Sequence, residues 1–264
     1  MEKEGFDYRN EIEKLHEQNA KMIESLKPVF AITQKLTREL SESLLPAQKA
    51  LEEFRETIKS HVLNPDSFID NINKACQDNT KFGWCISAHM TISSYRKIAS
   101  NEHNQEEKDR VFISEFESNN FELYEQEKKS IILSAQEGWR TFYKECFYLI
   151  DNQKYQAVIP SLMSAIEHEL TSGQTRDYGK KLIERLKTSL KNEGDPTSLL
   201  YAVSTSVLTL LDNKIFKSRD FDRSRLPIIN RNWVLHGRDT PSLWGKQDVY
   251  KLIAIISALR MLNK

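Results

Sequence analysis

The 264-residue sequence has little glycine and proline, with 8 and 7 residues respectively. These residues mark turns, and an all-β fold needs many of them. No segment alternates polar and apolar residues long enough to indicate a strand. Hydrophobic residues make up 39% and charged residues 29%, which is typical of a folded chain rather than a disordered one. The composition therefore favours long helices.

Cysteine is equally scarce, since only Cys76, Cys85 and Cys146 occur. They are too few and too widely spaced for a zinc cage, and their odd number fits poorly with a disulfide framework. No run approaches the ~18 apolar residues of a membrane span, and residues 1–5 lack the apolar core of a secretory signal. We therefore expect a cytoplasmic protein that uses no membrane, metal or cofactor.

Net charge is also absent, because 38 basic residues balance 38 acidic ones. This excludes a global electrostatic attraction to nucleic acid or membrane. Residues 214–238 nevertheless carry a net charge of +5, from two aspartates, Asp220 and Asp222, and seven basic residues: Lys214, Lys217, Arg219, Arg223, Arg225, Arg231 and Arg238. Such clusters contact phosphates, although a solvated loop and helix start would look the same.

What the sequence does contain is helical periodicity. From Tyr8 to Leu45 apolar residues recur every three or four positions, which predicts an amphipathic helix interrupted at Pro28. This region is either a coiled coil or partner-binding arm, or a helix packed on its own domain. We predict an all-α fold, with an N-terminal helical region over residues 1–120 and a helical bundle over residues 121–264.

Further helix boundaries follow from capping residues and stops. We expect a helix start at Pro65, two helices between Ser67 and Ser100, a loop or boundary at 101–110, a helix from Val111, a helix over Tyr155–Leu170, a helix through Leu182–Leu190 stopped by a left-handed Gly194, a helix opened by Asp195 and Pro196, and a last helix over Val249–Leu262. The aromatic residues from Trp139 to Tyr148 have helical spacing and are assigned to the core.

The most informative segment is Leu226–Arg238. Pro227 suits the first turn of a helix and Gly237 suits its end, which predicts a helix over Pro227–His236. Asn232 and His236 are four residues apart and share a face, and the long side chain of Arg231 can swing toward them. A permanently charged guanidinium beside an imidazole that titrates near neutral pH suits acid/base chemistry on a phosphodiester.

The spacing of Arg231, Asn232 and His236 resembles the signature of the HEPN superfamily, whose members are small helical bundles. The stretch Asn230–Gly237 is similar to the motif of HEPN proteins from prokaryotic antiphage and toxin systems. The expected helix over Tyr155–Leu170, with an acidic residue in an apolar pattern, also resembles that arrangement. The resemblance covers residues 125–264, and the N-terminal region has no counterpart in it.

This resemblance implies a metal-independent endoribonuclease with a composite active site, formed where two protomers of a homodimer bring their motifs together. His236 would act as general base or acid, Arg231 would stabilise charge on the phosphate, and Asn232 would orient either group. The ribose 2'-hydroxyl would supply the nucleophile, so RNA, tRNA included, is the expected substrate. A toxin or antiphage role implies a restraining inhibitor or a sensor protein.

Other side chains receive supporting assignments. The resemblance implies that Glu167 supports Arg231 or His236, although a surface carboxylate would look the same. His168 is expected to be structural. Arg223, Arg225 and Arg238 are candidates for RNA contact. Two alternatives remain open at this point. The motif helix could be the interface of a non-catalytic HEPN-like binding module, or Arg231 and His236 could merely satisfy each other or nearby carbonyls.

Overall fold

The computed structural model describes residues 65–100, 104–171, 179–196, 198–221 and 224–262. These ranges contain helices and no strand, which confirms the all-α prediction. The elements are α2 (Pro65–Thr80), α3 (Ile92–Ala99), α4 (Gln105–Ser134), α5 (Glu137–Asp151), α6 (Tyr155–Leu170), α7 (Lys180–Glu193), α8 (Leu199–Leu210), the π-helical turn η1 (Leu211–Ile215), α9 (Arg231–Leu235), the 3-10 turn η2 (Pro241–Leu243) and α10 (Lys246–Leu262). The expected amphipathic arm at Tyr8–Leu45 lies outside the described residues.

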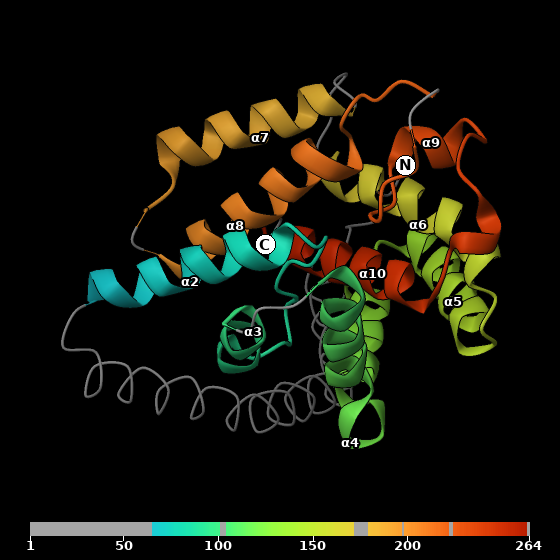
Figure 1. The fold of residues 1–264 in the computed structure, drawn as a ribbon, viewed down its shortest axis with the longest axis horizontal. Coiled ribbons are helices and arrows are strands. Elements are labelled where there is room, and N and C mark those ends of the chain that lie inside the picture. Colours follow the sequence, from blue (N-terminus) through green and yellow to red (C-terminus); the bar gives the residue numbers. More distant parts are fainter. Residues whose placement is uncertain (1–64, 101–103, 172–178, 197, 222–223, 263–264) are drawn as a thin grey trace, which may run out of the picture. The chain divides into compact units, whose positions relative to one another are not determined.

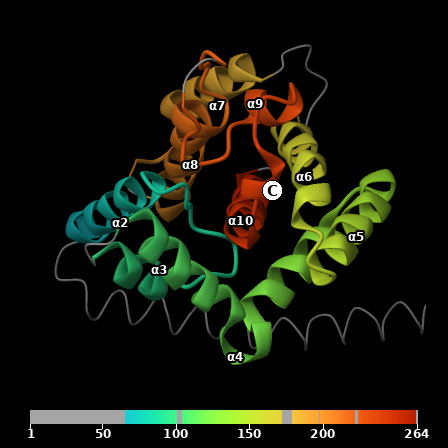
Figure 2. The same ribbon diagram turned by 45° about the vertical axis from the view of Figure 1, so that its right-hand side comes forward.

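The last helix, α10, runs through the middle of the bundle (Figure 1). Every residue from Asp248 to Leu259 is buried. Its sequence explains most of this burial, because residues 252–259 are apolar on all sides apart from Ser257 and have no face to offer to water. Asp248 and Lys251 are buried charged residues of the same helix. It packs against α6, α4 and α8, and Figure 2 shows it between α8 and α6. Within the described ranges, no helix has the length and apolarity to cross a membrane.

The surrounding helices extend this single core. Helix α2 packs on α8 and α3, and α5 packs on α6 and α4. The buried apolar side chains form one connected cluster, whose members range from Ile72 in α2 to Leu259 in α10. The boundary expected after residue 120 falls inside α4, at a kink where Asn119, Asn120 and Phe121 have positive φ. Residues on both sides of this kink belong to the same core.

Several helix ends differ from the sequence expectation. The predicted loop at 101–110 contains the start of α4, because Asn104 and Glu107 form a reciprocal capping box. Gly194 ends α7 with φ of −78°, so it is not a left-handed stop. Its role is steric, since an added Cβ would lie 2.4 Å from the carbonyl oxygen of Leu190. Helix α8 begins after the cap Ser198, not at Asp195 and Pro196.

Other boundaries agree with the sequence. Helix α6 spans the predicted Tyr155–Leu170, and two helices lie between residues 65 and 100 as expected. Of the aromatic residues assigned to the core, Tyr143 and Phe147 are buried, whereas Tyr148 is exposed. Periodicity thus predicted which segments are helical, and the exceptions lie at helix ends and on the outer face of α5.

Candidate functional site

The segment that carries the motif is held in place by Asn230. This side chain is 5% exposed and caps α9, because its Oδ1 accepts hydrogen bonds from the main-chain N–H groups of Asn232 at 3.0 Å and Trp233 at 3.3 Å. Its Nδ2 donates to the carbonyls of Lys214 at 3.0 Å and Lys217 at 2.9 Å. One amide therefore joins α9 to the end of η1 and to the segment after it.

The motif helix is shorter than the sequence predicts. Helix α9 has five residues and begins at Arg231 rather than at Pro227, because Asn230 is extended and caps the helix there. Pro227 and Ile228 form a bend before it, and both Ile228 and Ile229 are buried. The Asn230 side chain already caps the helix at Arg231, so the chain before it is not part of the helix.

The end of α9 lies where the sequence placed it. Gly237 has φ of +64°, a left-handed conformation that favours glycine. Its N–H donates to the carbonyl of Val234 at 3.1 Å, and the N–H of Arg238 donates to the carbonyl of Trp233 at 2.8 Å. These two bonds form a Schellman motif, which satisfies the last carbonyls of the helix.

Arg231 points toward α6. Its Nη2 forms an ion pair with Glu167 Oε1, and its Nη1 donates to Asn232 Oδ1 at 3.2 Å. The guanidinium carbon also lies 6.0 Å from the ring centroid of Phe216. The side chains of Arg231 and Glu167 are about one quarter exposed, at 25% and 27%. The structure therefore brings together Arg231, Asn232 and Glu167, which the sequence had selected.

His236 lies apart from this group. It is the C-cap of α9 and is exposed, and its ring lies 6.1 Å from that of Phe221. Within the described ranges its imidazole has no hydrogen-bond or ion-pair partner. The expected convergence of three polar groups is therefore seen for Arg231 and Asn232 only, although the main-chain N–H of His236 donates to the Asn232 carbonyl at 3.0 Å. The imidazole is open to a ligand from solvent.

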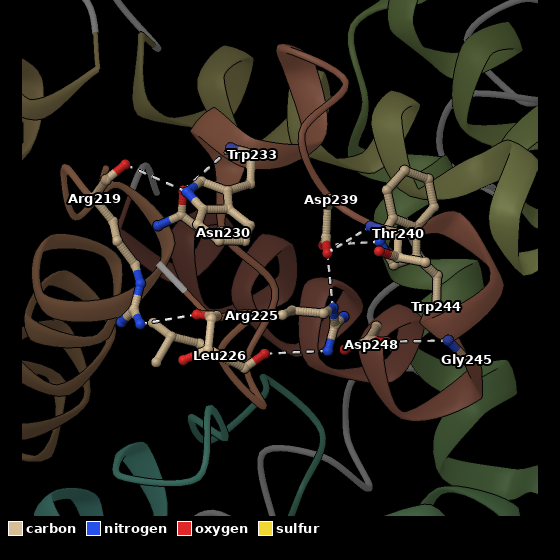
Figure 3. A network of polar contacts seen from close by, with 11 residues as sticks. Arg219, Arg225, Leu226, Asn230, Trp233, Asp239, Thr240, Trp244, Gly245 and Asp248 are labelled. Carbon is tan, nitrogen blue, oxygen red and sulfur yellow. Dashed lines mark hydrogen bonds and ion pairs between the residues drawn. The ribbon is translucent and has the colours of Figure 1, made fainter. Parts of the chain in front are cut away.

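Of the three arginines expected to contact RNA, Arg225 is engaged within the protein. Its Nε lies 2.7 Å from Asp239 Oδ1, and its Nη1 donates to the Leu226 carbonyl at 3.1 Å. The Asp239 side chain is 2% exposed and also accepts hydrogen bonds from the Trp244 indole at 2.9 Å and the Thr240 N–H at 2.8 Å. Figure 3 shows this cluster beside the Asn230 contacts. Arg225 thus links the chain before α9 to the chain after it.

The other two arginines differ. Arg238 is exposed, and its guanidinium carbon lies 5.4 Å from the ring centroid of Phe221. Arg223 lies outside the described residues. The sequence showed a run of positive charge but not which of these side chains pair with carboxylates of the protein. Asp239, for example, lies 14 positions from its partner Arg225.

A buried ionic network lies under the motif segment, and the sequence did not reveal it. Lys251 is 1% exposed, and its Nζ lies 2.7 Å from Asp109 Oδ1. Burial lowers the pKa of the Lys251 ammonium, while the carboxylate of Asp109 opposes this shift. Asp109 also accepts a hydrogen bond from the Trp84 indole at 2.7 Å. A Cβ added at Gly83 would meet both Ile228 and Lys251 at 3.2 to 3.3 Å, so the network packs closely against this segment.

The end of α6 carries further polar side chains. His168 stacks on Trp139, with ring centroids 3.8 Å apart and planes 10° apart, and burial lowers its pKa. Glu169 accepts a hydrogen bond from the Tyr143 hydroxyl at 2.6 Å and forms an ion pair with Arg260. His168 therefore has the structural surroundings expected for it, on a different face of α6 from Glu167.

Comparison with protein-family models, curated proteins and solved structures finds no match for this chain. In the part of the chain that the structure describes, no three His, Cys, Asp or Glu side chains are grouped to hold a metal ion. The residues of α9 and their contacts are therefore the features of this chain that point to a function.

Proposed function

We propose that this protein is a HEPN-type, metal-independent endoribonuclease that cleaves RNA through the ribose 2'-hydroxyl. The proposal is supported by the different surroundings of Arg231 and His236 at the two ends of α9. The guanidinium of Arg231 is oriented by Glu167 and Asn232, while the imidazole of His236 is exposed and unpaired in the described residues. An oriented cation and an accessible acid/base group are the two elements that this reaction needs.

The chemistry follows from these two groups. His236 takes the proton from the 2'-hydroxyl, whose oxygen attacks the adjacent phosphorus, or it returns a proton to the departing 5' oxygen. Arg231 stabilises the negative charge that builds up on the phosphate oxygens. Asn232 holds the guanidinium through its Oδ1. The products carry a 2',3'-cyclic phosphate and a 5'-hydroxyl. Because no described contact joins Arg231 to His236 within one protomer, a homodimer that places the two motifs face to face would complete the site.

The experiment is cleavage of total RNA and of tRNA by the purified full-length chain, in the presence of EDTA. We expect cleavage that leaves cyclic phosphate ends, and loss of it in His236→Ala and Arg231→Ala. Arg110→Ala is the matched charge control, because this arginine is exposed and pairs only with Glu106 among the described residues. If the wild-type dimer cuts no RNA, or if His236→Ala cuts as well as wild type, the proposal fails.

The biological setting we propose is a toxin or antiphage effector in the cytoplasm, restrained by an inhibitor or triggered by a sensor protein. Expression of wild type in a bacterial host should arrest growth, while His236→Ala should not. Equal growth of both strains at matched protein levels would contradict this role without affecting the cleavage assay.

A second candidate is a non-catalytic HEPN-like module that dimerises or binds a partner through α9. The ion pair of Arg231 with Glu167 favours it, because a guanidinium already paired has less capacity left for a phosphate. Leu235, which is 40% exposed beside His236, would suit a protein contact. In this case Arg231→Ala weakens self-association in sedimentation velocity, and no RNA cleavage is present to lose. Unchanged sedimentation together with lost cleavage would exclude it.

A further inference from the structure

Phe221 is an exposed aromatic residue beside the motif. It lies in the segment between η1 and α9 and is 49% exposed. Single exposed hydrophobic residues are common on protein surfaces and need no explanation alone. Phe221, however, contacts three side chains of the motif segment: Trp233, His236 and Arg238. It is therefore part of an assembled surface next to the imidazole.

The geometry of these contacts keeps the ring in place. The Trp233 ring lies 6.3 Å away at 53°, and the His236 ring lies 6.1 Å away at 67°. Trp233 is itself buried, and its indole N–H donates to the Arg219 carbonyl at 3.3 Å. Phe221 thus rests on a fixed side chain while half of it faces solvent.

Charge distinguishes this surface from a plain apolar patch. The Arg238 guanidinium carbon lies 5.4 Å from the Phe221 centroid. In the described ranges no carboxylate pairs with Arg238, because the neighbouring Asp239 is taken by Arg225. An aromatic ring with an unneutralised arginine beside it is the combination that proteins use for unstacked nucleobases and their phosphates.

We propose that Phe221 stacks a nucleobase of single-stranded RNA and that Arg238 contacts an adjoining phosphate, so that this nucleotide is held next to His236. This inference rests on the proposed ribonuclease function and specifies its substrate as unpaired RNA. Base pairing would hide the face that Phe221 needs. A protein partner fits the surface less well, since Leu235 is the one large apolar side chain that α9 itself exposes.

The test combines binding and kinetics with the full-length protein. Binding is measured by fluorescence anisotropy with a labelled single-stranded 2'-O-methyl oligoribonucleotide, which lacks the internal nucleophile and stays intact. Cleavage of the unmodified oligonucleotide gives KM and kcat. The variants are Phe221→Ala, Phe221→Leu and Phe221→Trp. Phe121→Ala is the matched control, because this phenylalanine has a similar exposure of 44% and belongs to α4. Helix α4 lies away from α9 in both views (Figures 1 and 2).

We expect Phe221→Ala and Phe221→Leu to raise Kd and KM on the order of tenfold with a smaller change in kcat, the loss expected for one stacked base. Phe221→Trp should restore binding, and Phe121→Ala should match wild type. Wild-type binding by Phe221→Leu would show that no aromatic ring is needed and would overturn the inference, as would altered sedimentation of Phe221→Ala with unchanged RNA binding. If wild type cleaves RNA and Phe221→Ala does so with the same KM, this inference alone fails. If wild type neither binds nor cleaves RNA, the proposed function fails with it.

Discussion

Asn230 offers a direct test of how α9 is positioned. Its side chain makes four hydrogen bonds, two that cap α9 and two that hold carbonyls near η1. At about 1 kcal/mol for each bond, Asn230→Ala would cost about 4 kcal/mol. Lys217 is exposed, so its carbonyl regains water, and we expect the free energy of unfolding to fall by about 3 kcal/mol. RNA cleavage should be lost with it, because Arg231 and His236 are no longer held.

The two halves of this contribution can be separated. Asn230→Ser keeps an oxygen that caps the helix but loses both amide donors, so it should cost about half as much as Asn230→Ala. Asn232→Ala is the matched control, because its side chain makes one described hydrogen bond, to Arg231, and should cost below about 1 kcal/mol. Urea denaturation followed by circular dichroism measures all three. If Asn230→Ala is no more destabilising than Asn232→Ala, the argument that Asn230 holds α9 is refuted.

Three further outcomes are expected. Glu167→Gln should lower kcat for RNA cleavage at least about tenfold. It should change the free energy of unfolding by less than about 1 kcal/mol, since the ion pair that it breaks is partly exposed. An unchanged kcat would contradict the positioning role of Glu167. Gly237→Ala should cost about 1 to 2 kcal/mol from its φ of +64° alone, as nothing lies within 4 Å of the added Cβ, and Gly237→Asn should cost less in the same urea assay. Burial by itself raises the pKa of Glu127, but hydrogen bonds from His89 and Ser257 lower it overall. Glu127 therefore stabilises the fold above its unfolded pKa of about 4.3, and this contribution disappears as the pH falls through the folded pKa, so Glu127→Gln should flatten the loss of stability below pH 5; parallel curves for variant and wild type would refute this.

Helix positions were largely predictable because periodicity is a local property. The apolar run of α10 and the pattern of α6 identify these helices without any tertiary information. Helix ends were less predictable, since capping depends on which neighbouring groups compete. Asn104 and Glu107 carried a capping-box signal within a segment that appeared too polar for a helix. Gly194 was recognised as a stop, but its reason is contact with Leu190 and not backbone conformation.

The site shows the same division. Spacing singled out Arg231, Asn232 and His236, and the resemblance to HEPN proteins added Glu167. The contact of Arg231 with Glu167 is present in the structure. The sequence did not reveal that Phe221 is exposed beside His236, because exposure is decided by what else covers a residue. It also did not separate Arg225 from Arg238, since both are equally basic in the sequence.

The sequence by itself determined an all-helical chain, the position of α6 and the left-handed end of α9 at Gly237, because each depends on a few residues close together. Only the tertiary structure decided that α9 begins at Arg231 and that Arg225 forms an ion pair with Asp239. It also decided that Lys251 is buried beneath the segment Leu226–Arg238. These features are contacts between groups that are far apart in sequence. Their interaction energies depend on burial and distance, which a local sequence pattern does not contain.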